Sequence, residues 1–211
     1  MNFRKLLIYF IATTVFLNTL FWALVIPYND APDEYTHFEV SQFIAFNNRF
    51  PVFGKDENMG VSKYEKPNFR AFYNASYSIM PPLAYIFQAM AIKIIPGIGE
   101  ANIYLSARIS SVILSFFYVL VVFKLAKLFF SEFYQQLAFV FLSVFIPQIT
   151  FTFSYVNSDA MALFLSTILF YYLVRLIKGE FEINLKNSLF LGILSGLTAL
   201  TRYNAFILFP F

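Results

Sequence analysis

Cysteine is absent from this 211-residue chain, and histidine occurs only once, as His37. The lack of cysteine excludes a disulfide framework, a thiolate metal site and a cysteine nucleophile. Charge is also scarce, because Asp, Glu, Lys and Arg make up 13% of the residues, about half of their share in a typical soluble domain. The 15 basic residues outnumber the 12 acidic ones only slightly, so the composition gives no reason to expect nucleic acid as a partner.

Apolar and aromatic residues dominate instead, with 59% hydrophobic residues, 30 Phe and 14 Tyr. This composition is typical of an integral membrane protein. The segment Leu6–Ile26 has 21 residues without a charge and is not followed by a small-residue cleavage site. It therefore predicts a retained transmembrane helix rather than a signal peptide. Arg4 and Lys5 precede it, which places the N-terminus in the cytoplasm and Tyr28 onward outside.

Four later apolar segments each approach the ~20 residues that a tilted transmembrane helix needs. They cover 105–125, 133–151, 160–176 and 187–211. The sequence thus predicts an all-α polytopic membrane protein with about five transmembrane helices, and with juxtamembrane helices inside a first external loop at 27–104. We expect 1–211 to form a single transmembrane module. Because the last segment has no flanking polar anchor, we expect this module to continue beyond Phe211.

The segment 81–97 is ambiguous, since only 13 residues separate its inner prolines. If it crossed the bilayer, the basic residues that follow it would face outward and the polar loop at 157–159 would face inward, against the positive-inside rule. If it lies in the membrane interface, those basic residues are cytoplasmic, and Asp33, Asp159 and Arg202 gather at the outer face. We favour the interfacial location. The basic residues concerned are Lys124, Lys127, Arg175, Lys178 and Lys186.

A polar, acidic stretch follows the first predicted span and contains Asp30, Asp33, Glu34 and His37. With Asp30 as N-cap, a helix over 33–50 places Asp33, Glu34 and His37 on one face and aromatic residues opposite. This pattern predicts an amphipathic helix on the outer membrane surface, with its acidic edge toward an aqueous cavity. Alternatively, the two carboxylates only complement the dipole of the first helical turn.

Two later positions combine polar chemistry with an apolar helix. Asn157, Ser158 and Asp159 open a predicted span, where they serve either as a cap or as part of a site shared with Asp33. Arg202 interrupts an apolar run near its outer end. An arginine at such depth usually faces a partner or a cavity, and phosphate suits its guanidinium, although snorkelling to lipid headgroups is the alternative. A metal site would have to be a carboxylate-only Mg or Mn site, which the sequence leaves open.

The order of short motifs resembles that of the GT-C membrane glycosyltransferases of the protein-mannosyltransferase and aminoarabinose-transferase type. The motifs are, in order, DAPDEYTHF, MPPLAY, a helix that Arg108 leads, FIPQ, VNSDA and GLTALTRYNAFILFP. The resemblance implies an acidic pair in the first external loop, a juxtamembrane helix after Pro-Pro, and a polyprenyl-phosphate-linked sugar as donor. The family's polar pair directly before Pro-Pro is missing here, and the nearest equivalent, Glu65-Lys66, lies further upstream.

The resemblance also implies roles for residues. Asp33 matches the acidic residue that activates the acceptor hydroxyl, and Glu34 its catalytic neighbour. Arg202 matches the basic residue that faces the lipid-linked phosphate. The residues expected to bind substrate are His37, Glu65, Lys66, Tyr85, Asn157, Asp159, Arg202 and Tyr203.

These observations predict a glycosyltransferase that moves a hexosyl or pentosyl group from a polyprenyl-phosphate donor to an acceptor by inverting displacement, with Asp33 as general base. We expect it in the bacterial plasma membrane, in contact with membrane lipid, with its active site outside. The sugar and the acceptor are not specified by the sequence. Two alternatives stay open: a membrane transporter, although transporters usually place polar groups near the bilayer midplane, and a non-catalytic membrane assembly subunit.

Overall fold

The computed structural model describes residues 3–52, 56, 80–95 and 103–204. All regular structure within these residues is helical, which confirms the predicted all-α fold class. The helices are α1 (Phe3–Val25), α2 (Glu34–Asn47), α3 (Leu83–Ile94), α4 (Ile103–Phe129), α5 (Phe133–Val144), α6 (Pro147–Ser154), α7 (Asp159–Ile177) and α8 (Leu185–Ala199).

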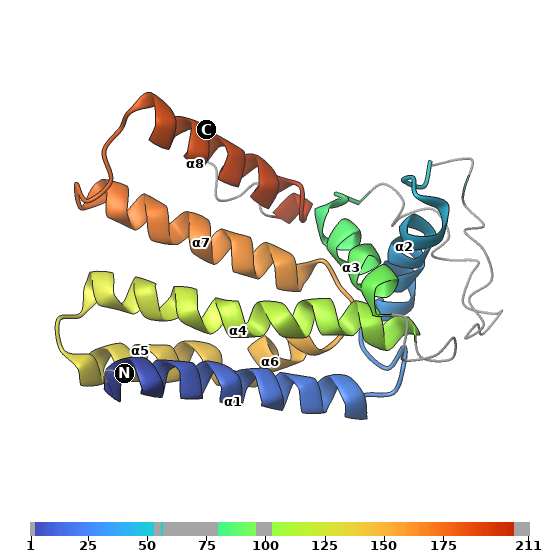
Figure 1. The fold of residues 1–211 in the computed structure, drawn as a ribbon, viewed down its shortest axis with the longest axis horizontal. Coiled ribbons are helices and arrows are strands. Elements are labelled where there is room, and N and C mark those ends of the chain that lie inside the picture. Colours follow the sequence, from blue (N-terminus) through green and yellow to red (C-terminus); the bar gives the residue numbers. More distant parts are fainter. Residues whose placement is uncertain (1–2, 53–55, 57–79, 96–102, 205–211) are drawn as a thin grey trace.

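The long helix α4 lies at the centre of a helical bundle, between α1 on one side and α7 on the other (Figure 1). It also packs against α3, α5 and α6. Its buried face carries many small side chains, including Ala107, Ser110, Ser111 and Ser115. Without a strong hydrophobic drive between helices in lipid, small residues allow the close backbone approach that stabilises such contacts. The helix α8 packs on α7 at the edge of the bundle.

Three helices, α1, α4 and α7, are long and apolar enough to cross a membrane, and a fourth span exists if α5 and α6 are counted together. These two helices are bent by 57° at their junction, because Pro147 starts α6 and cannot donate the hydrogen bond that would continue α5. The sequence predicted one apolar segment over 133–151 there, with a proline at FIPQ. The predicted fifth span corresponds to α8, which has 15 residues in the part of the chain that the structure describes.

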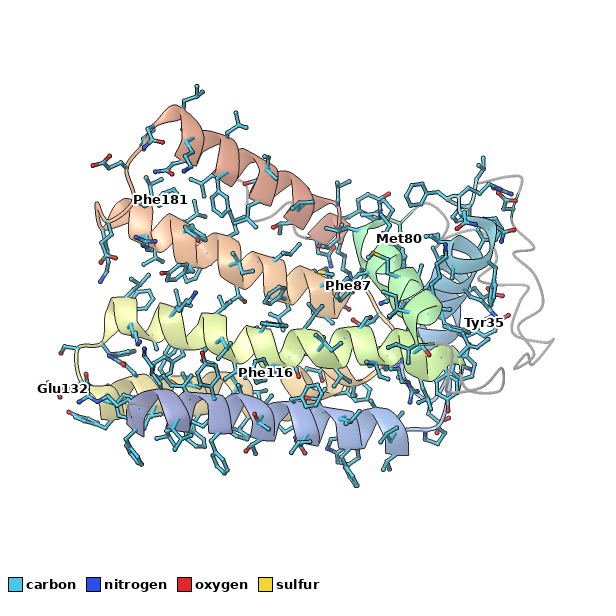
Figure 2. The ribbon with its side chains drawn as sticks, in the orientation of Figure 1. Tyr35, Met80, Phe87, Phe116, Glu132 and Phe181 are labelled. Carbon is cyan, nitrogen blue, oxygen red and sulfur yellow. The ribbon has the colours of Figure 1, made fainter. Side chains whose placement is uncertain are left out.

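Helices α2 and α3 lie across one end of the bundle, which we call the α2/α3 end (Figure 1). Figure 2 shows Tyr35 and Met80 there. With 12 residues, α3 is about 18 Å long, too short to cross a bilayer. Its first backbone N–H, from Leu83, donates to the carbonyl of Leu200 at 3.0 Å, so α3 begins level with the end of α8. This geometry agrees with the favoured interfacial placement, which stays a prediction.

The opposite end collects the basic residues, as the interfacial placement of α3 requires. The Lys178 ammonium binds the carbonyl of Leu128, which joins the end of α7 to that of α4. The Arg4 guanidinium lies 5.1 Å from the ring centre of Phe133, which joins the start of α1 to that of α5. Figure 2 shows Glu132 at this end. The predicted grouping of cationic loops is therefore correct in space.

Candidate functional site

The helix α2 is shorter at both ends than the sequence predicted. Its N-cap is Asp33 rather than Asp30, and it ends at Asn47. Pro32 disfavours helical backbone at the residue before it, so the helix cannot begin upstream. At the other end, Asn48 adopts a left-handed conformation with φ 53°, which stops the helix.

The Asp33 carboxylate is exposed and makes no capping hydrogen bond to α2. Its backbone is also left-handed, with φ 54°, a conformation that Asp tolerates better than most residues. The first turn is held instead by the Thr36 hydroxyl, which donates to the Asp33 carbonyl at 2.7 Å. The carboxylate of Asp33 therefore does not serve as the cap of α2.

Glu34 occupies a very different environment from its neighbour. Its carboxylate receives two hydrogen bonds from the Arg108 guanidinium, both of 2.6 Å, and both side chains are fully buried. The backbone N–H groups of Asn29 and Val156 donate to it as well, at 3.1 and 3.0 Å. The prediction that Glu34 faces an aqueous cavity was wrong, because Arg108 and two backbone donors surround it.

Arg108 also closes the end of α1. Its guanidinium donates to the carbonyls of Ala23 and Ile26 at 2.7 Å and of Pro27 at 3.2 Å. The last carbonyls of a helix have no partner within that helix, so the guanidinium supplies one. Sequence reasoning assigned Arg108 no role in the site. The sequence does contain a signal for it, because Arg108, like Arg202, is an arginine within an apolar run.

His37 links α2 to α3 through a 2.8 Å hydrogen bond between its Nδ1 atom and the Tyr85 hydroxyl. Both side chains are buried. The pKa of His37 is lowered from 6.5 to about 4, first by burial and then by the charge of Arg202, while the charge of Asp33 opposes the shift. His37 is thus neutral at neutral pH, and it lies within electrostatic reach of both Asp33 and Arg202.

A second polar chain crosses from α2 through α3 to the start of α7. The Ser41 hydroxyl donates to the Gln88 side-chain oxygen at 2.5 Å, and the Gln88 amide donates to the Asn157 carbonyl at 2.7 Å. The side-chain oxygen of Asn157 accepts from the Ala160 N–H at 2.9 Å. Asn157 is 1% exposed, so its side chain has the capping role that the sequence offered as an alternative.

Asp159 and Arg202 form an ion pair at the same end of the bundle. Their side chains are 41% and 33% exposed, respectively, so both can be reached from outside the protein. Together with the charges that act on His37, this pair confirms that Asp33, Asp159 and Arg202 gather at one end. Tyr203, which follows Arg202 in the sequence, has an exposed side chain. Glu65 and Lys66 lie outside the described residues.

No three His, Asp or Glu side chains within residues 3–52, 56, 80–95 and 103–204 come together as a metal site would require. The polar groups near His37 include the exposed Asp33 carboxylate, the neutral imidazole itself and the partly exposed ion pair of Asp159 with Arg202. Such a set suits proton transfer and the binding of an anion.

The fold and these residues define a polytopic membrane protein with a charged cluster at one end of its helical bundle. Residues 80–211 match the family described as dolichyl-phosphate-mannose-protein mannosyltransferase. The match covers more than half of the chain, which therefore belongs to this family of GT-C membrane glycosyltransferases. Tyr85, Arg108, Asp159 and Arg202 lie within the matched region, whereas Asp33 precedes it. No curated protein and no solved structure matches the chain.

Membership in this family implies a glycosyltransferase that depends on a polyprenyl-phosphate-linked sugar. The resemblance predicted from the motifs is thereby confirmed at the level of the family, and with it the general class of donor.

Proposed function

We propose that the chain transfers a hexosyl or pentosyl group, with mannose as the first candidate, from a polyprenyl-phosphate donor to an acceptor hydroxyl at the outer face of the membrane. In this proposal Asp33 is the general base, and Arg202 binds the phosphate of the donor. The acidic and basic groups come from distant parts of the chain and meet at the α2/α3 end.

The observation that carries the proposal is the joint effect of Asp33 and Arg202 on His37. The charge of Asp33 raises the pKa of that imidazole and the charge of Arg202 lowers it, so a carboxylate and a cation both lie within electrostatic reach of one side chain, which supports the proposal. A base must lie within hydrogen-bonding reach of the proton that it accepts, and a cation must lie where negative charge develops. Both requirements favour groups on the same end of the bundle.

The reaction follows from these two groups. The Asp33 carboxylate takes the proton of the acceptor hydroxyl while the hydroxyl oxygen forms a bond to the anomeric carbon of the sugar. The bond between that carbon and the phosphate oxygen breaks, and polyprenyl phosphate leaves with the electron pair. Arg202 stabilises the charge on the departing phosphate. Attack from the side opposite the leaving group inverts the anomeric centre.

Glu34 then acts through position rather than through contact with substrate. Four N–H groups from Arg108, Asn29 and Val156 donate hydrogen bonds to its two oxygens, so its carboxylate is already engaged within the protein. Its place directly after Asp33 in the chain fixes the start of α2. The buried bond between His37 and Tyr85 fixes the same helix against α3.

The outer-face location is supported by the positive-inside rule. Cationic residues gather at the end opposite the proposed site, and that end corresponds to the cytoplasm. A lipid-linked sugar would then reach Arg202 from the outer leaflet, with its tail still in the bilayer.

The test uses the full-length protein in liposomes, with polyprenyl-phosphate mannose carrying a labelled sugar and a mixture of candidate acceptors. Release of polyprenyl phosphate together with a labelled product supports the proposal. Movement of the intact lipid-linked sugar across the membrane, with no bond cleaved, would instead establish the transporter alternative.

A further inference from the structure

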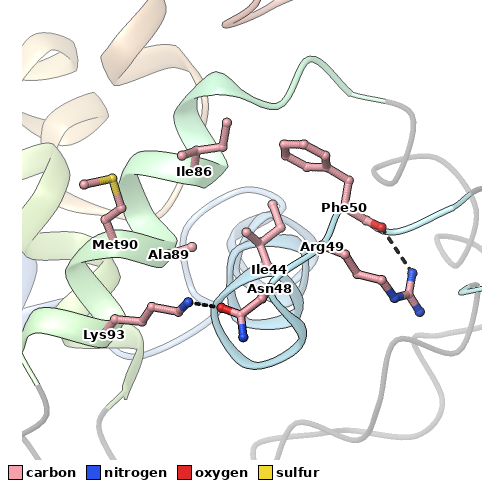
Figure 3. Close-up of a pocket in the computed structure, with 8 residues that line it drawn as sticks. All are labelled: Ile44, Asn48, Arg49, Phe50, Ile86, Ala89, Met90 and Lys93. Atoms are coloured by element: carbon pink, nitrogen blue, oxygen red, sulfur yellow. Dashed lines mark hydrogen bonds between the residues drawn. The ribbon is translucent and has the colours of Figure 1, made fainter.

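A groove runs between α2 and α3 on the surface of the α2/α3 end. It consists of two adjoining cavities of about 280 and 190 Å³ that share Ile44 and Phe50 as lining residues. Figure 3 shows the residues that line the larger cavity, among them Ile86 and Met90 of α3 and Ile44 of α2. The walls are mainly apolar, so the groove suits a hydrocarbon chain better than a sugar.

Charge is distributed unevenly along the rim of the groove. The Arg49 guanidinium binds both carboxylate oxygens of Asp56, at 2.7 and 2.8 Å, so its charge is largely neutralised. The Lys93 ammonium binds the uncharged side-chain oxygen of Asn48 (Figure 3). Lys93 makes no ion pair with any residue that the structure describes. A net positive charge therefore stands at one end of an apolar groove.

The groove lies at the level where helix α8 of the bundle ends. The start of α3 is hydrogen-bonded to Leu200 at the end of α8, so α3 lies where the bundle helices end. Around the groove, Phe46, Met90 and Ile94 are 61%, 51% and 72% exposed, respectively. Apolar side chains of this size beside a lysine are typical of a surface that dips into the boundary between headgroups and acyl chains.

We propose that this groove binds an anionic phospholipid of the surrounding leaflet. One acyl chain lies along the wall formed by Ile44, Ile86 and Met90, and the phosphate of the headgroup pairs with Lys93. Charge complementarity selects an anionic lipid over a zwitterionic one. Neither Asp33 nor Arg202 lines the groove, although Tyr85 does, and the existence of this lipid site does not depend on the proposed transfer reaction.

The absence of cysteine allows a direct test on the full-length chain. An Ile94→Cys variant, carrying a fluorescent label one turn beyond Met90 on α3, is placed in nanodiscs of phosphatidylcholine that contain a minor fraction of brominated lipid. The bromine quenches the label when that lipid stays near the groove. Brominated phosphatidylglycerol and brominated phosphatidylcholine are compared at equal fractions.

We expect phosphatidylglycerol to be enriched about five-fold over phosphatidylcholine near the label, the effect of one basic residue at a membrane surface. Lys93→Gln should abolish this preference, and Lys93→Arg should retain it. The matched control is Lys124→Gln, which removes an exposed lysine from α4 near the opposite end of the bundle and should leave the preference intact.

Equal quenching by the two lipids with Lys93 in place would overturn the proposal. So would a preference for phosphatidylglycerol that survives Lys93→Gln, because the headgroup would then be held elsewhere. Absence of quenching by either lipid would mean that something other than lipid fills the groove, which also overturns the proposal.

Discussion

Glu34 and Arg108 stand 74 positions apart in the sequence and form a doubly hydrogen-bonded ion pair that is closed to solvent. The pair joins the first loop, the end of α1 and the start of α4, while Val156 adds the connection before α7. A buried ion pair costs desolvation energy that its attraction only partly returns. Its value here lies in geometry, because it sets where α2 begins.

The first prediction concerns the stability of this pair. Arg108→Met should destabilise the protein by about 3–5 kcal/mol, because it leaves the buried Glu34 carboxylate without its countercharge. A double variant, Arg108→Met with Glu34→Met, should recover part of the loss, since no unpaired charge then remains. Thermal unfolding in detergent measures both effects.

An exposed ion pair provides the control for that experiment. Arg175 and Glu180 lie 3.7 Å apart with side chains 29% and 48% exposed. Replacing Arg175 with Met should cost at most about 1 kcal/mol. A loss as large as that of Arg108→Met would show that the buried pair has no special structural role.

The second prediction concerns Asp33 as general base. Asp33→Asn should lower the transfer rate from a saturating donor by about 10²- to 10⁴-fold. Asparagine tolerates the left-handed backbone that Asp33 adopts, so the variant should fold normally. Asp30→Asn, at an exposed neighbouring carboxylate, should keep the wild-type rate. A fully active Asp33→Asn protein would remove this residue from the chemistry.

The third prediction concerns Arg202 and the donor. Arg202→Gln should raise the KM for the lipid-linked donor strongly. It should lower the melting temperature only slightly, because the side chain is partly exposed and water can solvate either residue. Arg202→Lys should recover part of the affinity, since it keeps the charge but loses the planar fork. Arg175→Gln, near the other end of the bundle, serves as the control. Unchanged donor KM in Arg202→Gln would contradict the phosphate role.

The fourth prediction concerns pH and His37. Its pKa is about 4 in the folded protein and 6.5 in an exposed histidine, so between these values the unfolded state binds more protons. The resulting stability is complete above pH 6.5 and is lost as the pH falls toward 4, by about 3 kcal/mol in total. His37→Gln should reduce the fall in melting temperature over this range. An unaltered pH dependence in the variant would show that His37 is not the group responsible.

The fifth prediction concerns topology. Asp30→Cys lies at an exposed position before α3, and Lys127→Cys lies at an exposed position in the last turn of α4. If α3 stays on one side of the membrane, the two positions face opposite sides. An impermeant thiol reagent should then label Asp30→Cys in intact cells and leave Lys127→Cys unlabelled until the membrane is opened. Labelling of both cysteines in intact cells would mean that α3 crosses.

Local signals in the sequence predicted much of the fold. Long uncharged runs give the spanning helices, because a bilayer requires about 20 apolar residues. The position of α3 followed from charge parity, since Lys127 and Lys178 had to share a side. The bend before Pro147 was not predicted, although the rigid ring that breaks a helix is visible in the sequence.

The candidate site was predicted only in part, because its contacts join distant segments. The grouping of Asp33, Asp159 and Arg202 followed from topology alone. The separation of roles between Asp33 and Glu34 did not, since nothing local tells which of two adjacent carboxylates meets Arg108. The hydrogen bonds that the Glu34 carboxylate accepts come from residues as far away in the sequence as Val156, and only the folded chain shows them.

The way Arg108 completes α1 has a consequence for biogenesis. The carbonyls of Ala23, Ile26 and Pro27 receive their guanidinium partner from a residue more than eighty positions later. When the first helix enters the bilayer during translation, these three carbonyls do not yet have Arg108 as their hydrogen-bond partner. The loop that follows α1 then also lacks its contact with Arg108. The loop can reach its final shape only after α4 has been synthesised and inserted beside α1, so the order of translation delays the completion of this end of α1.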